Sequence, residues 1–218
     1  MTDILAKLRE LICGFDASNP LLFNTGLFLL LFLGFLLVYQ SLSRVQWLKM
    51  IFVILFSLYF YYKSSAEYCF ILLGVCLFDF VLGNILGHTE NVMARKIMVA
   101  LNVVVNIGML CYFKYLNLIV ATFADMASLD FDPFDIILPA GISYFTIRSI
   151  SYIVDIYRKE IEPCGNFLQY TFFLTFFPPL LAGPVVRAKD FLPQIKQNPV
   201  ADHFMVSAGF FLIICGLV

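Results

Sequence analysis

The chain has 218 residues, of which 61% are hydrophobic and 13% are charged, and its mean hydropathy is +0.91. A soluble domain is closer to half apolar, whereas apolar runs of membrane-spanning length recur along this chain, so the composition predicts an integral membrane protein in a lipid bilayer. The net charge of −1 gives no support to nucleic-acid binding, and we expect no nucleic-acid partner.

The N-terminal segment, residues 1–19, is not a signal peptide, because charges of both signs are mixed and no basic segment leads directly into an apolar run. Its apolar residues fall on one helical face. They are Ile4, Leu5, Leu8, Leu11 and Ile12. We predict an amphipathic helix over 1–19 that lies in the membrane interface, followed by a transmembrane domain over 20–218.

Four apolar runs, each of roughly membrane-spanning length, predict the first four spans. They cover about 20–40, 46–62, 67–87 and 97–120. The third contains Asp79, which is either a proton-relay carboxylate or, the interpretation we favour, a side chain near the helix end bonded to backbone or to Asn84. Gly83 and Gly87 in the same span have a spacing that is typical of close helix packing.

Three further apolar segments follow a loop with four aspartates, Asp125, Asp130, Asp132 and Asp135. The segments cover about 136–157, 166–184 and 204–218. The last has only about 15 residues, short of the ~20 needed to span a bilayer, so we expect the chain to end inside a helix. The fold class is therefore all-α, with about five to seven membrane helices.

The segment over 166–184 contains Pro178, Pro179 and Pro184, which have no backbone N–H to donate. Broken backbone at membrane depth is tolerated where it is buried in protein or lines a cavity. We therefore predict a proline-broken re-entrant element that lines a cavity.

The basic residues predict an orientation. With the N-terminus outside, nine of the 14 Lys and Arg residues face the cytoplasm, and the four-aspartate loop faces outward. The nine are Arg44, Lys49, Arg95, Lys96, Arg158, Lys159, Arg187, Lys189 and Lys196. The positive-inside rule favours this arrangement, provided that 166–184 enters and leaves on the same side.

The cysteines and histidines form no metal-binding pattern. The six cysteines contain no CxxC motif, and we interpret them as small buried hydrophobic residues rather than disulfide partners or metal ligands. His88 and His203 are far apart in sequence, so we expect no metal and no bound cofactor. We interpret both as surface or interfacial histidines rather than catalytic bases.

A polar stripe lies on segment 136–157. Arg148, near its middle, is costly in a membrane and must face a partner or an aqueous cavity. Helical spacing places other polar residues on the same face. They are Tyr144, Ser151, Tyr152 and Asp155. Arg148 and Asp155 are two turns apart and bracket either a polar channel or a structural network that joins helices. Arg187 and Lys189 either anchor the chain at the cytoplasmic face or attract the phosphates of an anionic donor.

Two stretches carry the motifs of a known family. LPAGISYFTIRSISYIVDIYRKEI covers 138–161, and NFLQYTFFLTFFPPLLAGPVVRAKDFLPQI covers 166–195. Their patterns LPxGIS, SYxxDxYR and FFPxLxAGPxxR resemble the membrane-bound O-acyltransferase (MBOAT) family, and most closely the bacterial branch with alginate O-acetylase and the D-alanyl-lipoteichoic acid transfer protein. The matching residues are Pro139, Gly141, Ser143, Asp155, Tyr157, Arg158, Pro178, Gly183, Pro184 and Arg187.

The resemblance implies an enzyme of a bacterial inner (cytoplasmic) membrane. Such an enzyme transfers an acyl group, acetyl or similar, from a cytoplasmic thioester (acyl-CoA or an acyl-carrier protein) to a hydroxyl of an extracytoplasmic polysaccharide or cell-envelope polymer. A tunnel lined by broken helices joins the two sides, and an acyl carrier or an extracytoplasmic acyl-transfer protein is an implied partner. The tunnel or substrate-lining candidates are Ser143, Tyr144, Arg148, Ser151, Tyr152, Asp155 and Arg187.

The family's catalytic histidine lies downstream of the AGPxxR motif, in a region beyond Val218 in this numbering. Neither His88 nor His203 matches it, so we expect no catalytic residue among these residues and no activity from the 218-residue chain alone. Two alternatives stay open. Broken helices with buried charge also build transporter sites, and a non-catalytic membrane scaffold would pair with another protein.

Overall fold

The structure, a computed structural model, describes residues 25–42, 45–126, 132–136, 138–181, 183, 186–197 and 202–217. All regular structure within these ranges is helical, as the sequence predicts. The predicted interfacial helix over 1–19 lies outside the described residues, as do Arg44, Asp130 and Pro184.

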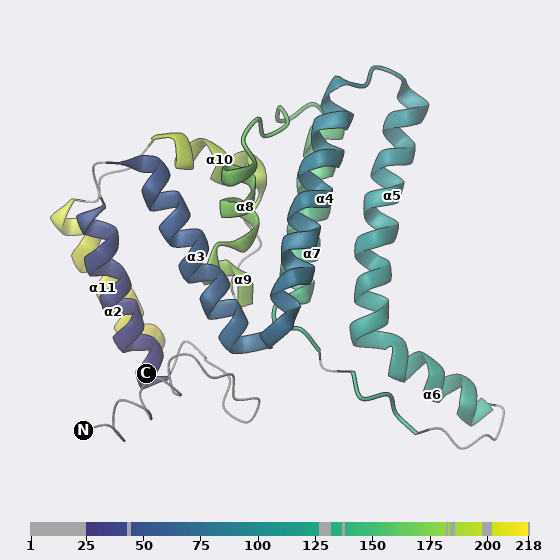
Figure 1. Cartoon of the computed structure of the whole chain (residues 1–218), viewed down its shortest axis with the longest axis horizontal. Helices are drawn as coiled ribbons and strands as arrows, with labels where there is room; N and C mark the ends of the chain where they lie inside the picture. Colours follow the sequence, from purple (N-terminus) through teal and green to yellow (C-terminus); the bar gives the residue numbers. More distant parts are fainter. Residues whose placement is uncertain are drawn as a thin grey trace.

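The first three described helices follow the predicted spans closely. α2 covers Gly26–Ser41, α3 covers Gln46–Ser65 and α4 covers Cys69–His88, and a short 3₁₀-helix, η1 (Ala66–Tyr68), joins α3 to α4. α2 begins at Thr25, whose side-chain oxygen accepts from the backbone N–H of Phe28 at 3.3 Å. The three helices run in alternating directions (Figure 1).

The fourth predicted span is longer than expected and bent. α5 (Val92–Leu110) continues through a π-helical turn, η2 (Cys111–Tyr115), into α6 (Leu116–Met126), which turns away from the axis of α5 in Figure 1. The predicted start at 97 is wrong because the charges of Arg95 and Lys96 suggested a loop. Arg95 is in fact buried in the first turns of α5, whose N-cap is the side chain of Asn91.

Five helices form the second half of the described chain. They are α7 (Ile142–Tyr157), α8 (Phe167–Thr175), α9 (Phe177–Leu181), α10 (Ala188–Gln197) and α11 (His203–Leu217). α7 begins later than predicted because the chain turns at Gly141, whose φ of 70° is a left-handed conformation that favours glycine. α10 was not predicted, because it is short and polar and contains Pro193.

The predicted break lies at Phe176. Its φ of −51° and ψ of 115° leave the helical region and separate α8 from α9. Pro178 and Pro179 reinforce the break, since neither can donate to the carbonyl four residues earlier. Phe177, the first residue of α9, is 3% exposed and packs among phenylalanine rings of α2 and α3.

The chain then returns to the end of the molecule at which α8 begins. Lys189 of α10 binds Glu160, in the loop between α7 and α8, at 3.2 Å. The carbonyl of Ile195, later in α10, accepts from Nε2 of Gln46 at the start of α3, at 2.5 Å. Both ends of the broken segment therefore lie on one side of the molecule, which we call the basic end (Figure 1).

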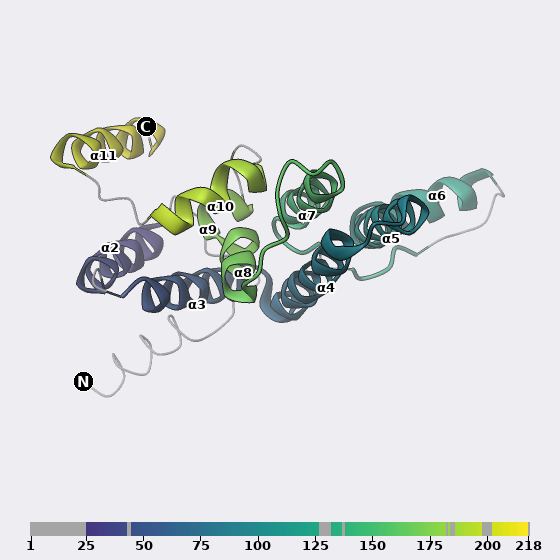
Figure 2. The same cartoon turned by 90° about the horizontal axis from the view of Figure 1, so that it is seen from above.

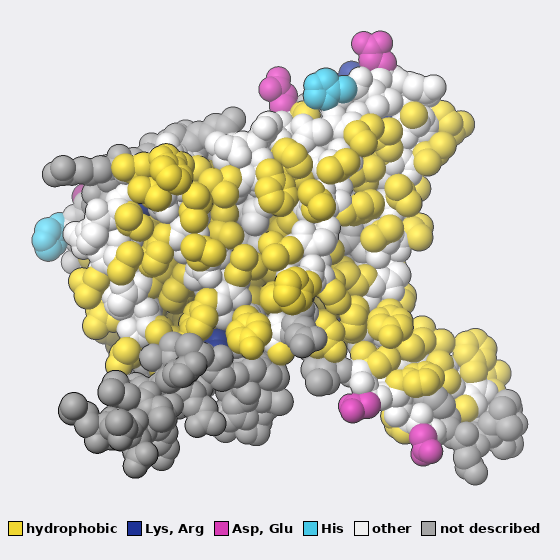
Figure 3. Space-filling model, in the orientation of Figure 1, with side chains coloured by type: hydrophobic (Ala, Val, Ile, Leu, Met, Phe, Trp, Pro, Cys, Tyr) yellow, Lys and Arg dark blue, Asp and Glu magenta, His cyan; other side chains and the backbone are white. Residues whose placement is uncertain are grey.

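Seen from above, α2, α3 and α4 form one row, α10, α9 and α7 lie behind it, and α8 lies between them (Figure 2). α7 packs against α4 and α5, and α8 packs against α3 and α4. Figure 3 shows apolar side chains across the helices and acidic side chains at the ends. Two of the described helical stretches, Cys69–His88 and Val92–Met126, are long and apolar enough to cross a membrane by length and composition.

Two glycines of α4 allow the close packing that their spacing predicts. A Cβ atom on Gly83 would lie 2.9 Å from Cε1 of Tyr152 in α7, and one on Gly87 would collide with Pro163.

The prediction that the cysteines are buried holds for some of them and fails for others. Cys76 and Cys164 are buried as predicted, whereas Cys111 and Cys215 are exposed, and none of the described cysteines forms a disulfide.

Candidate functional site

Five polar side chains meet between α4, α5, α7 and α8, and we call them the polar hub. They are Asp79, Asn102, Asn106, Ser149 and Tyr170. None is more than 1% exposed. Asp79 accepts from Nδ2 of Asn102 at 2.7 Å and from the Tyr170 hydroxyl at 2.8 Å, while Nδ2 of Asn106 donates to Oγ of Ser149 at 2.9 Å. Nδ2 of Asn102 also donates to Oγ of Ser149 at 3.4 Å, so the hub links α4, α5, α7 and α8, with the carboxylate bonded directly to α5 and α8.

The favoured prediction for Asp79 is wrong. Asp79 lies in the middle of α4, and its partners come from α5 and α8. Asn84 instead donates to the carbonyls of Phe80 and Cys164. The missed signal is the pair of asparagines one turn apart in the apolar helix α5, since buried amides in a membrane helix point to interhelical hydrogen bonds.

Arg148 points from α7 towards the broken end of α8. It is 1% exposed, and Nη2 donates to the carbonyl of Phe173. Its Cζ lies 4.5 Å from the ring centroid of Phe173 and 6.0 Å from that of Phe191 in α10. A helix end carries carbonyls without a regular donor and a partial negative charge, so the guanidinium suits this place. Nε and Nη1 of Arg148 have no hydrogen-bond partner.

Asp155 lies two turns further along α7, towards the basic end. It is 4% exposed, and its buried Oδ2 has no hydrogen-bond partner. In the described part of the chain Asp155 and Arg148 form no ion pair with each other. The nearby charges that act on Asp155 come from the surface of the basic end. They are Glu160, Arg187, Lys189 and Arg158.

The other predicted candidates lie at different depths along α7. Ser143 and Tyr144, both partly buried, line a cavity of about 140 Å³ with Lys114, at the end opposite the basic end. Tyr152 is fully buried, and its hydroxyl accepts from the backbone N–H of Cys164 at 2.9 Å. The stripe predicted on α7 therefore does face the interior at Arg148, Tyr152 and Asp155. Ser151 is partly buried and Arg187 is exposed.

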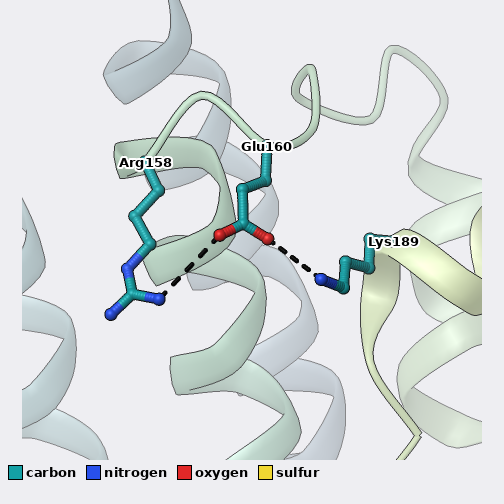
Figure 4. Close-up of polar contacts among 3 residues, drawn as sticks. All are labelled: Arg158, Glu160 and Lys189. Atoms are coloured by element: carbon teal, nitrogen blue, oxygen red, sulfur yellow. Dashed lines mark hydrogen bonds and ion pairs between the residues drawn. The ribbon is translucent and has the colours of Figure 1, made fainter.

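Charged residues hold the basic end together. Glu160 binds Lys189 and also lies 3.8 Å from Nη1 of Arg158 (Figure 4). Beside them, a cavity of about 320 Å³, which we call the basic-end cavity, lies between the α7–α8 loop, the start of α8 and α10. Its lining includes Cys164, Gln169, Lys189 and Leu192.

Arg95 has a role that its position in the sequence did not reveal. It is 8% exposed and donates to four backbone carbonyls at distances of 2.8–3.1 Å. The acceptors are Leu86, Thr89, Ile156 and Tyr157. One guanidinium therefore caps the C-terminal ends of α4 and α7 together, where its charge also suits the helix dipoles.

The two histidines lie away from these buried groups. His88 is exposed at the end of α4, with Nδ1 2.8 Å from the carbonyl of Asn84, and His203 is exposed at the start of α11. Among the described residues no three His, Cys, Asp or Glu side chains gather as metal ligands. The reactive or binding groups of the candidate site are therefore a carboxylate, a guanidinium and hydroxyl groups, surrounded by apolar side chains.

Comparison with known proteins identifies the family. The chain is 28% identical over 227 aligned positions to the peptidoglycan O-acetyltransferase of Helicobacter pylori, covering 90% of this chain and 43% of that protein. It is 34% identical over 183 positions to the probable alginate O-acetylase AlgI of Pseudomonas aeruginosa, covering 82% of this chain and 35% of that protein. The chain belongs to the membrane-bound O-acyltransferase family. A teichoic acid D-alanyltransferase of Lacticaseibacillus rhamnosus matches 29% of this MBOAT chain at 33% identity.

No family model and no solved structure matches the sequence, so the MBOAT assignment rests on these relatives. The resemblance predicted from the motifs is confirmed. The chain spans about two fifths of the length of the first two relatives. Together with the apolar helices, the relatives show that this is a membrane protein.

Proposed function

We propose that this protein takes part in moving an acyl group, acetyl or similar, from a cytoplasmic thioester to a hydroxyl of an extracytoplasmic polysaccharide or cell-envelope polymer. The observation that carries the proposal is the similarity, over 82–90% of the chain, to relatives named O-acetylase and O-acetyltransferase. In this reaction the hydroxyl oxygen attacks the thioester carbonyl, a base takes the hydroxyl proton, and the thiol leaves. Acyl-CoA or an acyl-carrier protein is the donor.

In the proposed topology, the segment from α8 to α10 forms a re-entrant element at the cytoplasmic side of a bacterial inner membrane. The contacts of Lys189 with Glu160 and of Gln46 with Ile195 support it, because they hold both ends of the element at the basic end. The positive-inside rule then turns the basic end to the cytoplasm. The N-terminus lies outside, and the aspartate-containing loop after α6 faces outward.

We assign α7 as one polar wall of the path that the substrates follow between the two sides of the membrane. The support is the order of its polar residues, from the small cavity at Ser143 and Tyr144, past the buried Arg148, to Asp155 at the basic end. Ser151, Tyr152 and Arg187 complete the proposed lining. The hydroxyl groups and the guanidinium orient donor and acceptor, while neither His88 nor His203 is assigned the role of the base.

The test is the O-acyl ester content of the envelope. The complete reading frame that contains this sequence is expressed in a bacterium, and base-labile acyl groups on purified envelope polymers are measured. We expect esters that depend on expression. Arg148→Gln and Asp155→Asn should each lower the ester content about tenfold, equivalent to ~1.4 kcal/mol of transition-state stabilisation.

Leu77→Ala is the matched control, because Leu77 is 57% exposed on the outer face of α4. It should leave the ester content unchanged. A protein that is abundant in the membrane but adds no ester would refute acyl transfer and favour a transport or scaffold function. Full ester content in both polar variants would refute the assigned path along α7.

A further inference from the structure

Helix α10 separates the basic-end cavity from Arg148. Lys189 and Leu192 of α10 line the cavity. Phe191 points to another face of the same helix, because consecutive helical residues are about 100° apart. Its ring centroid lies 6.0 Å from Cζ of Arg148. The ring therefore lies beside the guanidinium, on a different face of α10 from the side chains that line the cavity.

Phe191 packs on the broken end of α8, at the edge of the main core. Its ring centroid is 5.8 Å from that of Phe173, 5.4 Å from that of Phe176 and 6.0 Å from that of Phe172. The Phe191 side chain is only partly buried. A half-buried ring at the edge of the core can change its rotamer with less repacking than a fully buried ring.

The polar contacts that hold α10 in place lie at the surface. Lys189 binds the partly exposed Glu160, and the carbonyl of Ile195 accepts from the exposed amide of Gln46. Solvent-exposed ion pairs contribute little to stability. These polar contacts are cheap to break, so α10 is held mainly by the apolar packing of Ala188, Phe191 and Leu192.

The guanidinium of Arg148, next to Phe191, has N–H groups that can still bind a ligand. Arg148 is 1% exposed, yet Nε and Nη1 have no hydrogen-bond partner. Buried polar groups are nearly always paired, and a guanidinium recognises carbonyl and carboxylate oxygens with its fixed N–H groups. The chemistry of Arg148 thus fits a ligand that carries a carbonyl or anionic oxygen.

We propose that Phe191 is a gate between the basic-end cavity and Arg148, and that its displacement lets a solute with an anionic or carbonyl oxygen reach the unused N–H groups of Arg148. The gate goes beyond acyl transfer. Its test uses thiol labelling, so its failure and the failure of the proposed enzyme activity are observed separately.

Two native cysteines report on the two sides of the gate. Cys164 lines the basic-end cavity. Cys76 is fully buried in the same core cluster as Phe173, whose carbonyl accepts from Arg148. Two proteins are made in which only Cys164 or only Cys76 is kept and the other five cysteines are alanine. Each is treated in detergent with a small anionic methanethiosulfonate, which forms a disulfide with the thiol and releases methanesulfinate.

The gate predicts that Cys164, which is 7% exposed at the cavity wall, is labelled faster than the fully buried Cys76 in the parent proteins. Phe191→Ala should accelerate labelling at Cys76 at least about tenfold, equivalent to ~1.4 kcal/mol. Phe191→Leu, a milder change that keeps apolar volume, should give an intermediate rate. The anionic reagent should react faster than a cationic methanethiosulfonate of similar size, and Arg148→Gln should abolish that preference.

Phe52→Ala is the matched control, because Phe52 is a partly buried phenylalanine of α3 whose ring stacks on Phe35 of α2, with 5.3 Å between the centroids. It should leave labelling at Cys76 unchanged. Three results would overturn the gate: equal labelling of Cys76 and Cys164 in the parents, no acceleration in both Phe191 variants, or equal acceleration by Phe52→Ala.

Discussion

Replacing Asp79 by alanine removes the acceptor on which the polar hub depends. The amide of Asn102 and the hydroxyl of Tyr170 donate to it at 2.7 and 2.8 Å. Both donors are fully buried, so water cannot replace the carboxylate without entering the core. Asp79→Ala therefore removes the acceptor of the Tyr170 hydroxyl and leaves Nδ2 of Asn102 only its longer contact to Oγ of Ser149, at 3.4 Å. Asp79→Asn keeps one acceptor oxygen for these two donors.

The magnitude follows from the two lost hydrogen bonds. A buried donor left unsatisfied costs about 1–3 kcal/mol in soluble proteins, or about 2–6 kcal/mol for two. Hydrogen bonds between membrane helices are weaker, averaging about 0.6 and reaching about 1.7 kcal/mol, which gives about 1–3 kcal/mol for two. The ranges overlap near 2–3 kcal/mol, so we predict that Asp79→Ala lowers the free energy of unfolding by about that amount.

The assay is reversible unfolding in mixed micelles, followed by far-ultraviolet circular dichroism as the fraction of denaturing detergent rises. Leu77→Ala, on the exposed face of the same helix, is the control and should change the unfolding free energy by less than about 0.5 kcal/mol. Asp79→Asn should fall between the two. If Asp79→Ala is no less stable than Leu77→Ala, the hub does not hold the four helices together.

Four further substitutions test the packing with the same titration. Arg95→Ala removes the shared cap of α4 and α7 and should lower the free energy of unfolding by about 2–4 kcal/mol. Hydrogen bonds to charged groups contribute about 1.5–3 kcal/mol each, and water near this end reduces the total because it can replace some of them. A loss below about 1 kcal/mol would argue against the cap. Gly83→Ala places a methyl 2.9 Å from a carbon of Tyr152 and should cost about 1–3 kcal/mol. Gly74→Ala, with nothing within 4 Å, should instead stabilise by about 0.5–1 kcal/mol, and equal effects at the two glycines would contradict the packing. Phe177→Ala empties the centre of an aromatic cluster and should cost about 3–5 kcal/mol; a neutral result would mean that α9 does not pack as described.

Local sequence signals predicted the described helices where they were strong. The apolar runs gave α3 and α4 to within a few residues at each end. Pro178 and Pro179 located the break, because missing N–H groups cannot be restored by tertiary packing. α10 escaped prediction because it is stabilised by packing on the aromatic rings of α8, and the pattern of its own ten residues does not reveal that partner.

The polar partners could not be predicted in the same way. Helical spacing placed Arg148, Tyr152 and Asp155 on one face, and that face is buried. The spacing says nothing of what lies opposite, so it left a polar channel and a structural network between helices as alternatives for Arg148 and Asp155. The structure instead sets Arg148 against a carbonyl in α8, 25 residues away. Asp79 likewise meets Tyr170 across 91 residues, a separation at which only the folded packing decides the contact.

The most direct test of the account is acyl transfer across a sealed membrane. Inner-membrane vesicles that contain the protein from the complete reading frame receive a labelled acyl thioester on the cytoplasmic face only, with envelope polymer enclosed on the other face. The account predicts base-labile label on the enclosed polymer, reduced about tenfold by Arg148→Gln. Intact vesicles in which the protein is folded and the label stays on the donor would contradict it.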